Sequence, residues 1–570
     1  MDNGAARETQ RYRTAVGGQI DRSRLVSFTF DGQTLTGHPG DTLASALLAN
    51  GIHLVGRSFK YHRPRGILAA GSEEPNALVT VRRGWRRTTP NIRATEVEIY
   101  DGLMAESQNR WPSLARDVGS VNDRIAPFLP AGFYYKTFMG LRANKGSRAW
   151  VRYFEPAIRR MAGLGRAPQG SDPDHYARIH AHCDVLVVGM GPAGLMAALA
   201  ASETGARVII ADEQALPGGS LIGETKPRIG GRAVADWLAD TIGVLEQRDN
   251  VRLLRRTTVF GSYPDRMMGM VQRLSDHLAE PPPGLPRERL WQVRAHAIVL
   301  ATGAIERPQV FPGNDRPGIM LAHAALTYLD RFGVLAGTQA VLLTDNDEAY
   351  RALPELKASG AQIARVVDLR ETPGTAARQL AAEAGAVIVA GGSVCRTSGR
   401  ARIESVTITH ASGHDEQIEA NLLLMSAGFT PTLHLFSQLG GRLAWDNGVG
   451  AMVPASEVAH VWLAGAASGE RGLAASLAGG LAAGRNAARD ACPVTLEQGA
   501  ATEPVSAPEV TGVVDLAGDG GEREIAMTRL VNPGRAFVDF QNDVTAKDLG
   551  LATREGFRSV EHVKRYTTTG

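Results

Sequence analysis

Three glycines and an acidic residue near the middle of the chain have the spacing of a phosphate-binding turn. Gly189, Gly191 and Gly194 follow an apolar run, and Asp212 ends the next apolar run. Gly189 permits a tight turn, Gly191 lets the backbone approach a pyrophosphate with no Cβ in the way, and Gly194 lets a helix pack closely on a sheet. A carboxylate at Asp212 could accept hydrogen bonds from ribose hydroxyls. These residue types predict a dinucleotide site.

The segments on either side of this turn have the patterns of the elements that must hold it. Residues 183–188 and 207–211 are apolar runs typical of buried strands, and the alanine-rich residues 192–202 favour a helix between them. The N–H groups at the start of that helix would face the phosphates. Two later apolar runs, 297–303 and 422–428, also end in a glycine turn. The order of elements predicts a dinucleotide-binding α/β domain.

A second α/β unit opens at 339–344, where the sequence predicts another buried strand. The turn that follows it, from Asp345 to Tyr350, contains three acidic residues and no glycine. Without glycine the backbone cannot approach a pyrophosphate closely, and the carboxylates would repel it. We expect this unit to keep the fold but not to bind a second dinucleotide.

Composition places the chain among ordinary globular proteins of two to four domains. It has 570 residues, 44% of them hydrophobic and 21% charged, with a formal net charge of +3. This balance argues against nucleic-acid partners, and no apolar run is long enough to span a membrane. No apolar signal segment is visible at the N-terminus. The three cysteines are far apart, which argues against a metal site or disulfide framework and favours the cytoplasm.

The N-terminal segment has the element order of a β-grasp module. Residues 25–36 predict a hairpin with an Asp-Gly turn, 42–50 a helix that Asp41 could cap, and 76–81 a further strand. The loop at 56–66 between them is dense in basic and aromatic residues. It either faces a cofactor or a partner subunit, or it is a solvated loop with stacked arginines; both interpretations stay open.

Longer motifs resemble the α subunit of heterotetrameric sarcosine oxidase over nearly the whole chain. The resemblance is carried by residues 58–66, 71–77, 187–194, 211–214, 217–220, 301–308 and 537–545, with 554–556 and 564–567 near the C-terminus. In that family the α subunit normally continues into a folate-binding, aminomethyltransferase-like domain. The sequence stops at Gly570, so it is either a fragment of such an α subunit or an α subunit without that domain, and the resemblance transfers no folate-binding residue.

The resemblance implies an α/β fold whose core is of the FAD/NAD(P)-binding, two-dinucleotide-binding-domain type. The implied division is a β-grasp, ferredoxin-like module at 1–105, a connecting helical segment at 106–182, the dinucleotide-binding domain at 183–495 with the second α/β unit inserted at about 331–420, a linker at 496–512, and a small α+β module at 513–570.

Cysteine placement separates this chain from relatives that hold iron–sulfur clusters in such modules. Gly56 stands where the first cluster cysteine would fall, and no cysteine precedes Cys183. Near the C-terminus, Asp539 and Gln541 stand where a Cys-x-Cys pair would be. Because clusters are held by thiolates, we expect no iron–sulfur cluster and no bound metal.

The resemblance also implies which cofactor the glycine turn holds. Flavoproteins of this fold usually place a Gly-Asp pair late in the domain, whereas here Ala466 follows Gly465. This departure implies NAD rather than FAD. The implied positions are Gly191 and Ala193 at the pyrophosphate, Asp212 and Glu213 at the adenosine ribose, Ser220 and Val259 near the adenosine, and Ala466 and Leu473 near the far end. Further cofactor-binding residues are expected at Gly189, Gly194, Gln214, Thr302 and Gly303.

By resemblance, the chain is a subunit of a complex that oxidises sarcosine to glycine. The by-products would be hydrogen peroxide and either formaldehyde or methylene-tetrahydrofolate, with FAD in a partner subunit, FMN at a subunit interface and β, γ and δ subunits as partners. No catalytic residue is expected in this chain. Two alternatives stay open: an FAD-dependent amino-acid or opine-type dehydrogenase subunit, and a scaffold whose nucleotide site is vestigial.

Overall fold

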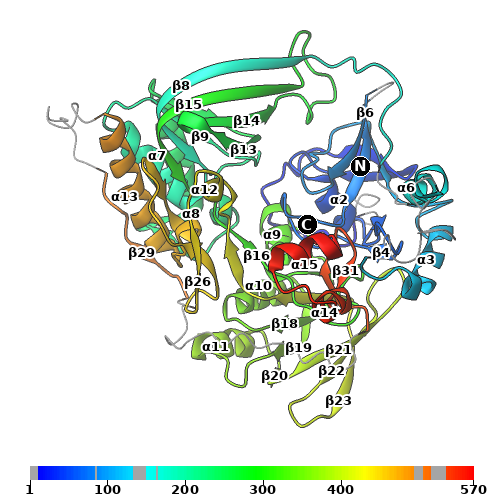
Figure 1. The fold of residues 1–570 in the computed structure, drawn as a ribbon. Helices are drawn as coiled ribbons and strands as arrows, with labels where there is room; N and C mark the ends of the chain where they lie inside the picture. The colour runs from blue at the N-terminus through cyan, green and yellow to red at the C-terminus, as the bar shows by residue number, and fades with distance from the viewer. Residues whose placement is uncertain are drawn as a thin grey trace. The chain divides into compact units, whose positions relative to one another are not determined.

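A computed structural model shows the chain as two compact units, neither of which is continuous in sequence (Figure 1). Unit 1 comprises Met1–Pro173, Pro308–Ala427 and Ala526–Gly570, and unit 2 comprises Asp174–Arg307 and Gly428–Ile525. The structure describes residues 10–83, 87–132, 149–161, 165–492, 505–514, 516 and 534–570.

Unit 2 is built on a seven-stranded sheet with the order β12-β9-β8-β15-β14-β13, and β28 pairs with β15. The pairings among β12, β9, β8, β15 and β28 are parallel, and β13 and β14 extend the sheet in antiparallel register. The strands are β8 (Tyr176–Val188), β9 (Val208–Ala211), β12 (Val251–Leu254), β13 (Thr257–Tyr263), β14 (Met267–Arg273), β15 (Glu288–Leu300) and β28 (Val461–Leu463). The last four residues of β8 and of β15 and the whole of β9 are buried, which explains their apolar runs.

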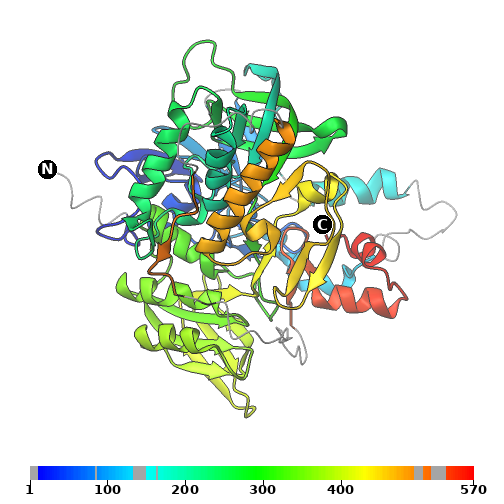
Figure 2. The same cartoon turned by 90° about the vertical axis from the view of Figure 1, so that its left-hand side faces the viewer.

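Two helices, α7 (Pro192–Ser202) and α13 (Leu473–Ala491), pack against each other beside this sheet (Figures 1 and 2). Their backbones are so close that a Cβ on Gly480 would lie 2.2 Å from the carbonyl oxygen of Ala193. A Cβ on Gly484 would lie equally close, 2.2 Å, to the carbonyl oxygen of Ala197. Small residues on α13 therefore fix the position of α7, whose first turn follows the glycine motif.

The N-terminal part of unit 1 is a five-stranded sheet with the order β2-β1-β7-β5-β6. Its strands are β1 (Val26–Phe30), β2 (Gln33–Gly37), β5 (Leu78–Arg82), β6 (Thr88–Arg93) and β7 (Leu103–Ser107). The helix that follows the hairpin, α2 (Leu43–Ala49), is capped by Thr42, whose side chain accepts from the Ser45 N–H. The expectation that Asp41 caps it is wrong, because the Asp41 carboxylate instead pairs with Arg13 at 2.6 Å.

A parallel sheet with the order β17-β24-β18-β19-β20 forms the second part of unit 1. Its strands are β17 (Ile319–Leu321), β18 (Gln339–Thr344), β19 (Gln362–Asp368), β20 (Ile388–Ala390) and β24 (Leu422–Ser426). Its main helices are α9 (Ala322–Phe332), α10 (Ala352–Ala358) and α11 (Thr375–Glu383). An antiparallel sheet of β21 (Ser393–Ser398), β22 (Ser405–Thr409) and β23 (Asp415–Glu419) follows β20. The strand expected at 339–344 is thus present.

The C-terminal part of unit 1 is small. It contains β30 (Phe537–Asp539), β31 (Val544–Thr545), α14 (Ala546–Arg554) and α15 (Val560–Thr567). Thr545 and Asp548 form a reciprocal capping box at the start of α14. Residues 493–504, which include most of the linker predicted at 496–512, lie outside the described residues, and the domain boundaries expected from the sequence stay predictions. Across the part of the chain that the structure describes, no helix is long and apolar enough to cross a bilayer.

Candidate functional site

The turn between β8 and α7 has a backbone that two of its glycines make possible. Gly189 has a φ of +104°, and a Cβ on it would lie 2.3 Å from the carbonyl oxygen of Ala301. A Cβ on Gly194 would lie 1.9 Å from the carbonyl oxygen of Gly189. Since real Cβ atoms do not approach other atoms this closely, both positions require glycine for the fold itself.

Gly191 differs from these two glycines. It is the N-cap residue of α7 in an extended conformation, and a Cβ there would meet no atom within 4 Å. The space in front of the helix N-terminus is therefore open, while the backbone N–H groups of the first helical turn lack helical partners. The fold would accept a side chain at position 191. A ligand that approaches this backbone closely requires glycine there, and a pyrophosphate is the ligand that such a turn suits.

A second glycine loop lies against the turn. The Gly218 N–H donates to the Met190 carbonyl at 2.8 Å. A Cβ on Gly219 would lie 2.9 Å from the Cα of Gly191. Within the motif at 217–220, Ser220 is the residue predicted to contact the adenosine. The structure adds Gly219 as the residue whose missing side chain keeps the turn open.

The side chain of Asp212 is directed at the turn rather than left for a ligand. Its Oδ2 accepts the Met190 N–H at 2.7 Å, and its Oδ1 accepts the Gln214 N–H at 2.8 Å. These two bonds tie the end of β9 to the glycine turn and fix the backbone that follows. The geometry therefore makes Asp212 an organiser of the turn, in addition to the predicted role at the ribose.

The other predicted residues of the site lie around this turn in unit 2. Thr302 and Gly303 follow Ala301, whose carbonyl touches the turn, and the Thr302 hydroxyl donates to the Thr432 carbonyl at 2.7 Å. Ala466 follows Gly465, where a Cβ would lie 2.9 Å from the Cβ of Ala193. Leu473 begins α13, Glu213 follows Asp212, and Val259 lies on β13 two residues after Thr257, whose N–H donates to the Asp212 carbonyl at 2.7 Å.

The corresponding turn of the second α/β unit, in unit 1, is occupied by its own charged side chains. Asp347 pairs with Arg370 at 2.6 Å, and Asp368, at the end of β19, pairs with the same guanidinium at 2.7 Å. Tyr350 donates to Asp368 at 2.8 Å. The carboxylates of this turn are thus paired within the unit, and the turn has no glycine at 345–350. That this unit binds no second dinucleotide stays a prediction.

The basic loop at 56–66 is not a solvated arginine stack. Arg65 is 1% exposed and its guanidinium bonds both Asp543 and Asp315, the latter at 2.6 Å. Arg63 makes a bidentate pair with Asp315 at 2.6 and 2.8 Å. Burial opposes ionisation of Asp315, but the two guanidinium groups outweigh it and lower the pKa of that carboxyl. The loop is therefore part of a buried ionic cluster.

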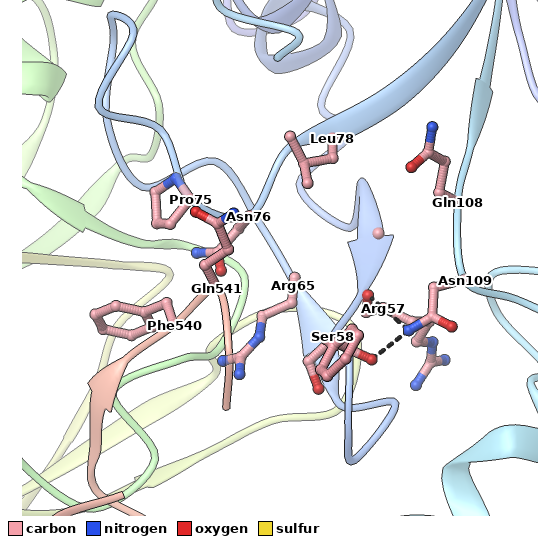
Figure 3. A pocket seen from close by; sticks show the side chains of 12 residues that line it. Arg57, Ser58, Arg65, Pro75, Asn76, Leu78, Gln108, Asn109, Phe540 and Gln541 are labelled. Atoms are coloured by element: carbon pink, nitrogen blue, oxygen red, sulfur yellow. Dashed lines mark hydrogen bonds between the residues drawn. The ribbon is translucent and has the colours of Figure 1, made fainter. Parts of the chain in front are cut away.

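A small pocket of about 40 Å³ lies beside this cluster, within unit 1 (Figure 3). Its walls come from the basic loop, from the segment around Asn76, from Asn109 and from the C-terminal residues Phe540 and Gln541. The Oδ1 atoms of Asn76 and Asn109 and the Nε of Arg65 are buried there without hydrogen-bond partners. A space of this size suits a few ordered waters bridging these groups.

Glu74 organises the loop that leads into this pocket. It is fully buried, and its carboxylate accepts the N–H groups of Leu68, Ala69, Asn76 and Ala77 at 2.6–3.0 Å. Burial raises the pKa of Glu74 to about 7, and the four backbone donors only partly oppose that shift. Sequence patterns gave no sign of this residue's role, because its partners are backbone atoms.

We expect Glu74→Gln to flatten the pH dependence of stability. Because the folded pKa of about 7 lies above the ordinary value of 4.5, the native state holds a proton that the unfolded state releases, and stability falls as the pH rises through that window. The slope should reach about 1.4 kcal/mol per pH unit in the native protein. Urea titrations at several pH values measure it, with the exposed neighbour Glu73→Gln as control; equal slopes in all three proteins would contradict this role.

Comparison with known protein families matches three parts of the chain. Residues 23–110 match a 2Fe-2S iron-sulfur cluster binding domain, residues 184–272 an FAD dependent oxidoreductase family, and residues 533–570 a sarcosine oxidase A3 domain. The match at 184–272 contains the glycine turn and Asp212.

The first of these matches overturns the expectation of no iron–sulfur cluster, because the family it names is one of cluster binders. That expectation rested on cysteine placement alone. The sequence of residues 23–110 contains no cysteine, so thiolates from within this range cannot supply the usual ligands of such a cluster. We assign no electron-transfer step to it.

Curated relatives resemble nearly the whole chain. The alpha subunit of sarcosine oxidase from Rhizobium meliloti (strain 1021) is 48% identical over 562 residues, which are 98% of this chain and 54% of that protein. The alpha subunit of sarcosine oxidase from Corynebacterium sp. (strain P-1) is 39% identical over 96% of this chain and 52% of that protein. The chain spans about half the length of these relatives. An opine oxidase subunit from Agrobacterium tumefaciens (strain Ach5) is more distant, at 29% over 53% of this chain and 64% of that protein.

Among solved structures, an L-proline dehydrogenase from P. horikoshii has a similar fold. It is 18% identical, covers 97% of this chain and 90% of its own, and superposes with a TM-score of 0.63. Together with the family matches it confirms the predicted fold class, an oxidoreductase-type dinucleotide-binding α/β core with an N-terminal ferredoxin-like module.

Proposed function

We propose, from the premise that this chain is homologous to about half of the sarcosine oxidase alpha subunit, that it is the nucleotide-binding subunit of an oxidase that demethylates sarcosine to glycine. The observation that carries the proposal is the open space at Gly191 within a turn that Gly189, Gly194 and Asp212 hold rigid. The site can bind a dinucleotide, and the oxidase it serves is inferred from the relatives.

The bound dinucleotide in this proposal is NAD. The α7 N-terminus would face its pyrophosphate, Asp212 would hold the turn, and Glu213 would lie at the ribose end. When bound, NAD supplies a nicotinamide ring that can accept hydride. Ala466 follows Gly465 at the point where α13 approaches α7, so no carboxylate stands at that place. We assign no acid or base of amine oxidation to this chain.

The rest of the assembly belongs to the same proposal. The substrate is sarcosine, and the products are glycine, hydrogen peroxide and either formaldehyde or methylene-tetrahydrofolate. The partners are β, γ and δ subunits, with FAD in one of them and FMN at a subunit interface. The three cysteines are free thiols in the structure, which suits a reducing compartment such as the cytoplasm.

A second candidate places FAD at the glycine turn, which would make the chain a flavoprotein in its own right. The match of residues 184–272 to an FAD dependent oxidoreductase family favours it. The two candidates differ in which nucleotide the purified protein carries.

Identification of the released nucleotide tests the proposal. The native assembly is purified, denatured, and its nucleotides are separated and identified by mass spectrometry, while isolated chain is examined for a visible flavin absorbance band. NAD from the isolated chain at near one per chain is the expected result. Flavin at that ratio in the isolated chain would overturn the NAD assignment in favour of the second candidate, and a chain without nucleotide would make it a scaffold.

Asp212→Ala should weaken nucleotide retention. The substitution removes a charged acceptor from the Met190 and Gln214 amides, and hydrogen bonds to charged groups contribute about 1.5–3 kcal/mol each. Without these bonds the glycine turn is no longer held in its binding geometry, and we expect nucleotide affinity to fall at least about tenfold, equivalent to about 1.4 kcal/mol. NAD content after gel filtration measures it, and Asp249→Ala, an exposed residue of the same unit, is the control. Equal content in both variants would refute the role of Asp212.

A further inference from the structure

A short segment of unit 1 exposes five large apolar side chains and buries two polar ones, Asp117 and Asn122. It spans residues 111–128 and includes η1 (Val118–Ser120), α3 (Val121–Arg124) and η2 (Ala126–Phe128); α3 is labelled in Figure 1. Its exposed side chains are Trp111 at 69%, Val118 at 57%, Val121 at 47%, Ile125 at 41% and Phe128 at 68%. We call these five residues the apolar face.

The inner side of the segment is held by polar groups. Asp117 is 7% exposed and accepts the N–H groups of Trp111 at 2.9 Å and Gly119 at 3.2 Å. Its other oxygen pairs with His62 Nδ1 at 2.8 Å. The side chain of Asn122, 5% exposed, donates to the Lys60 carbonyl at 3.3 Å. The segment is thus fixed to the 57–62 loop through its polar side.

The apolar face is continuous. Val118, Val121, Ile125 and Phe128 are spaced i, i+3, i+7 and i+10 along successive helical turns, which places them on one side. Trp111 adjoins them, because its carbonyl accepts the Val118 N–H at 2.7 Å. A single exposed leucine or valine is ordinary, but five large apolar side chains on one preorganised surface are typical of an interface.

We propose that the apolar face docks a partner subunit that presents an apolar surface with an acidic rim. The proposal rests on the proposed function, which makes this chain one subunit of several. Arg116 and Arg124, in the same segment, are exposed and make no ion pair within the described residues. These two cations and the apolar centre define the chemistry that would complement the surface.

Charge separates this partner from the other possible occupants. A second copy of this chain would bring its own Arg116 and Arg124 to the same rim. The segment that follows, 129–148, contains Lys136, Arg142, Lys145 and Arg148 and no acidic residue. A second copy on this face, or the segment 129–148 folded over it, would bring further positive charges to Arg116 and Arg124. An acidic partner would bring negative charges instead.

The test uses the assembly purified from its own host through a tag on this chain. The variants are Val121→Glu/Ile125→Glu, which charges the centre of the apolar face, and Arg116→Glu/Arg124→Glu, which inverts its rim. Val387→Glu, at another exposed apolar position of unit 1 (57% exposed), is the matched control. Light scattering after gel filtration measures the assembly mass, and hydrogen exchange measures amide protection at 111–128 in the assembly and in the isolated chain.

The expected result is that both double variants lose the partner subunit, with affinity at least about tenfold weaker, while the control keeps it. The rim variant should be affected less at high salt, because exposed charges are screened. NAD content and the melting temperature should stay unchanged in all variants, which separates a lost interface from a misfolded chain or a failed nucleotide assignment.

Three results would overturn the proposal. The first is that the double variants keep the same partner. The second is that the amides of 111–128 are already protected from exchange in the isolated chain, which would mean that the segment 129–148 covers the face. The third is that the substitutions break a dimer of this chain alone. A native chain that purifies without any partner would contradict the proposed function first, and the docking surface with it.

Discussion

Gly191→Ala is expected to leave the stability of the nucleotide-free chain unchanged and to remove most of the dinucleotide that the chain binds. The added Cβ meets no protein atom within 4 Å, so the fold accommodates it. The same Cβ would occupy the space through which the backbone approaches a pyrophosphate. Retained nucleotide should fall by at least about tenfold, corresponding to a loss of about 1.4 kcal/mol of binding free energy. Nucleotide content per chain and the melting temperature are the two measurements.

Gly194→Ala is the matched comparison. Its Cβ would lie 1.9 Å from the carbonyl oxygen of Gly189, so the backbone must move and the folded state should lose about 1–3 kcal/mol or more. The pair separates two reasons for glycine in one motif: at Gly194 the fold requires it, and at Gly191 only the ligand does. If Gly191→Ala retained full nucleotide content, the turn would not be the pyrophosphate site.

Asp543→Asn is expected to destabilise unit 1 by about 3–5 kcal/mol, which is typical when one member of a buried ion pair is removed. Asp543 is 0% exposed, and it accepts the Lys60 and Tyr61 N–H groups at 2.8 and 2.9 Å in addition to bonding Arg65. Without its charge, the buried guanidinium of Arg65 would have only the carboxylate of Asp315, which it shares with Arg63.

Urea titration of the purified chain measures this effect. Asp240→Asn is the control, because Asp240 pairs with Arg232 at the surface, with side-chain exposures of 63% and 49%, and such pairs contribute at most about 1 kcal/mol. Similar midpoints for both variants would show that the buried cluster does not hold the C-terminal residues in place.

The elements around the glycine turn could be predicted because their signals are local. The strand before Gly189, the helix from Pro192 to Ser202 and the strand ending at Ala211 each have a distinct apolar pattern. The structure has the helix and the second strand at nearly the predicted bounds, whereas the first strand, predicted at 183–188, begins earlier, at Tyr176. The helix after the N-terminal hairpin was also predictable. Its cap was not, since Asp41 and Thr42 are adjacent and only the pairing of Asp41 with Arg13 decides between them.

The buried ionic cluster could not be predicted, because its members are hundreds of residues apart. Arg65 and Asp543 are separated by 478 positions and Arg63 and Asp315 by 252. The local pattern around Arg65 suits a solvated loop as well as a buried one. Gly219 shows the same limit, since its contact with Gly191 joins two loops that no periodicity relates.

The ferredoxin-like module shows how a composition argument can mislead. The absence of cysteine between residues 23 and 110 is real, and it led to the expectation of no cluster. The match to a 2Fe-2S iron-sulfur cluster binding domain rests on the pattern of the whole module, which the count of one residue type does not capture. Fold and ligand set are separate properties, and only the fold was predicted correctly.

The pairing of Arg65 with Asp543 has a consequence for how the protein is made. A chain emerges from the ribosome N-terminus first and its domains generally fold in that order. The seven-stranded sheet of unit 2 has all its strands once residue 463 has been synthesised. Unit 1 is complete only after Asp543 appears, 478 residues later than Arg65. Until Asp543 has been synthesised, Arg65 can pair only with Asp315, which it shares with Arg63, and the final residues act as the closing step of folding.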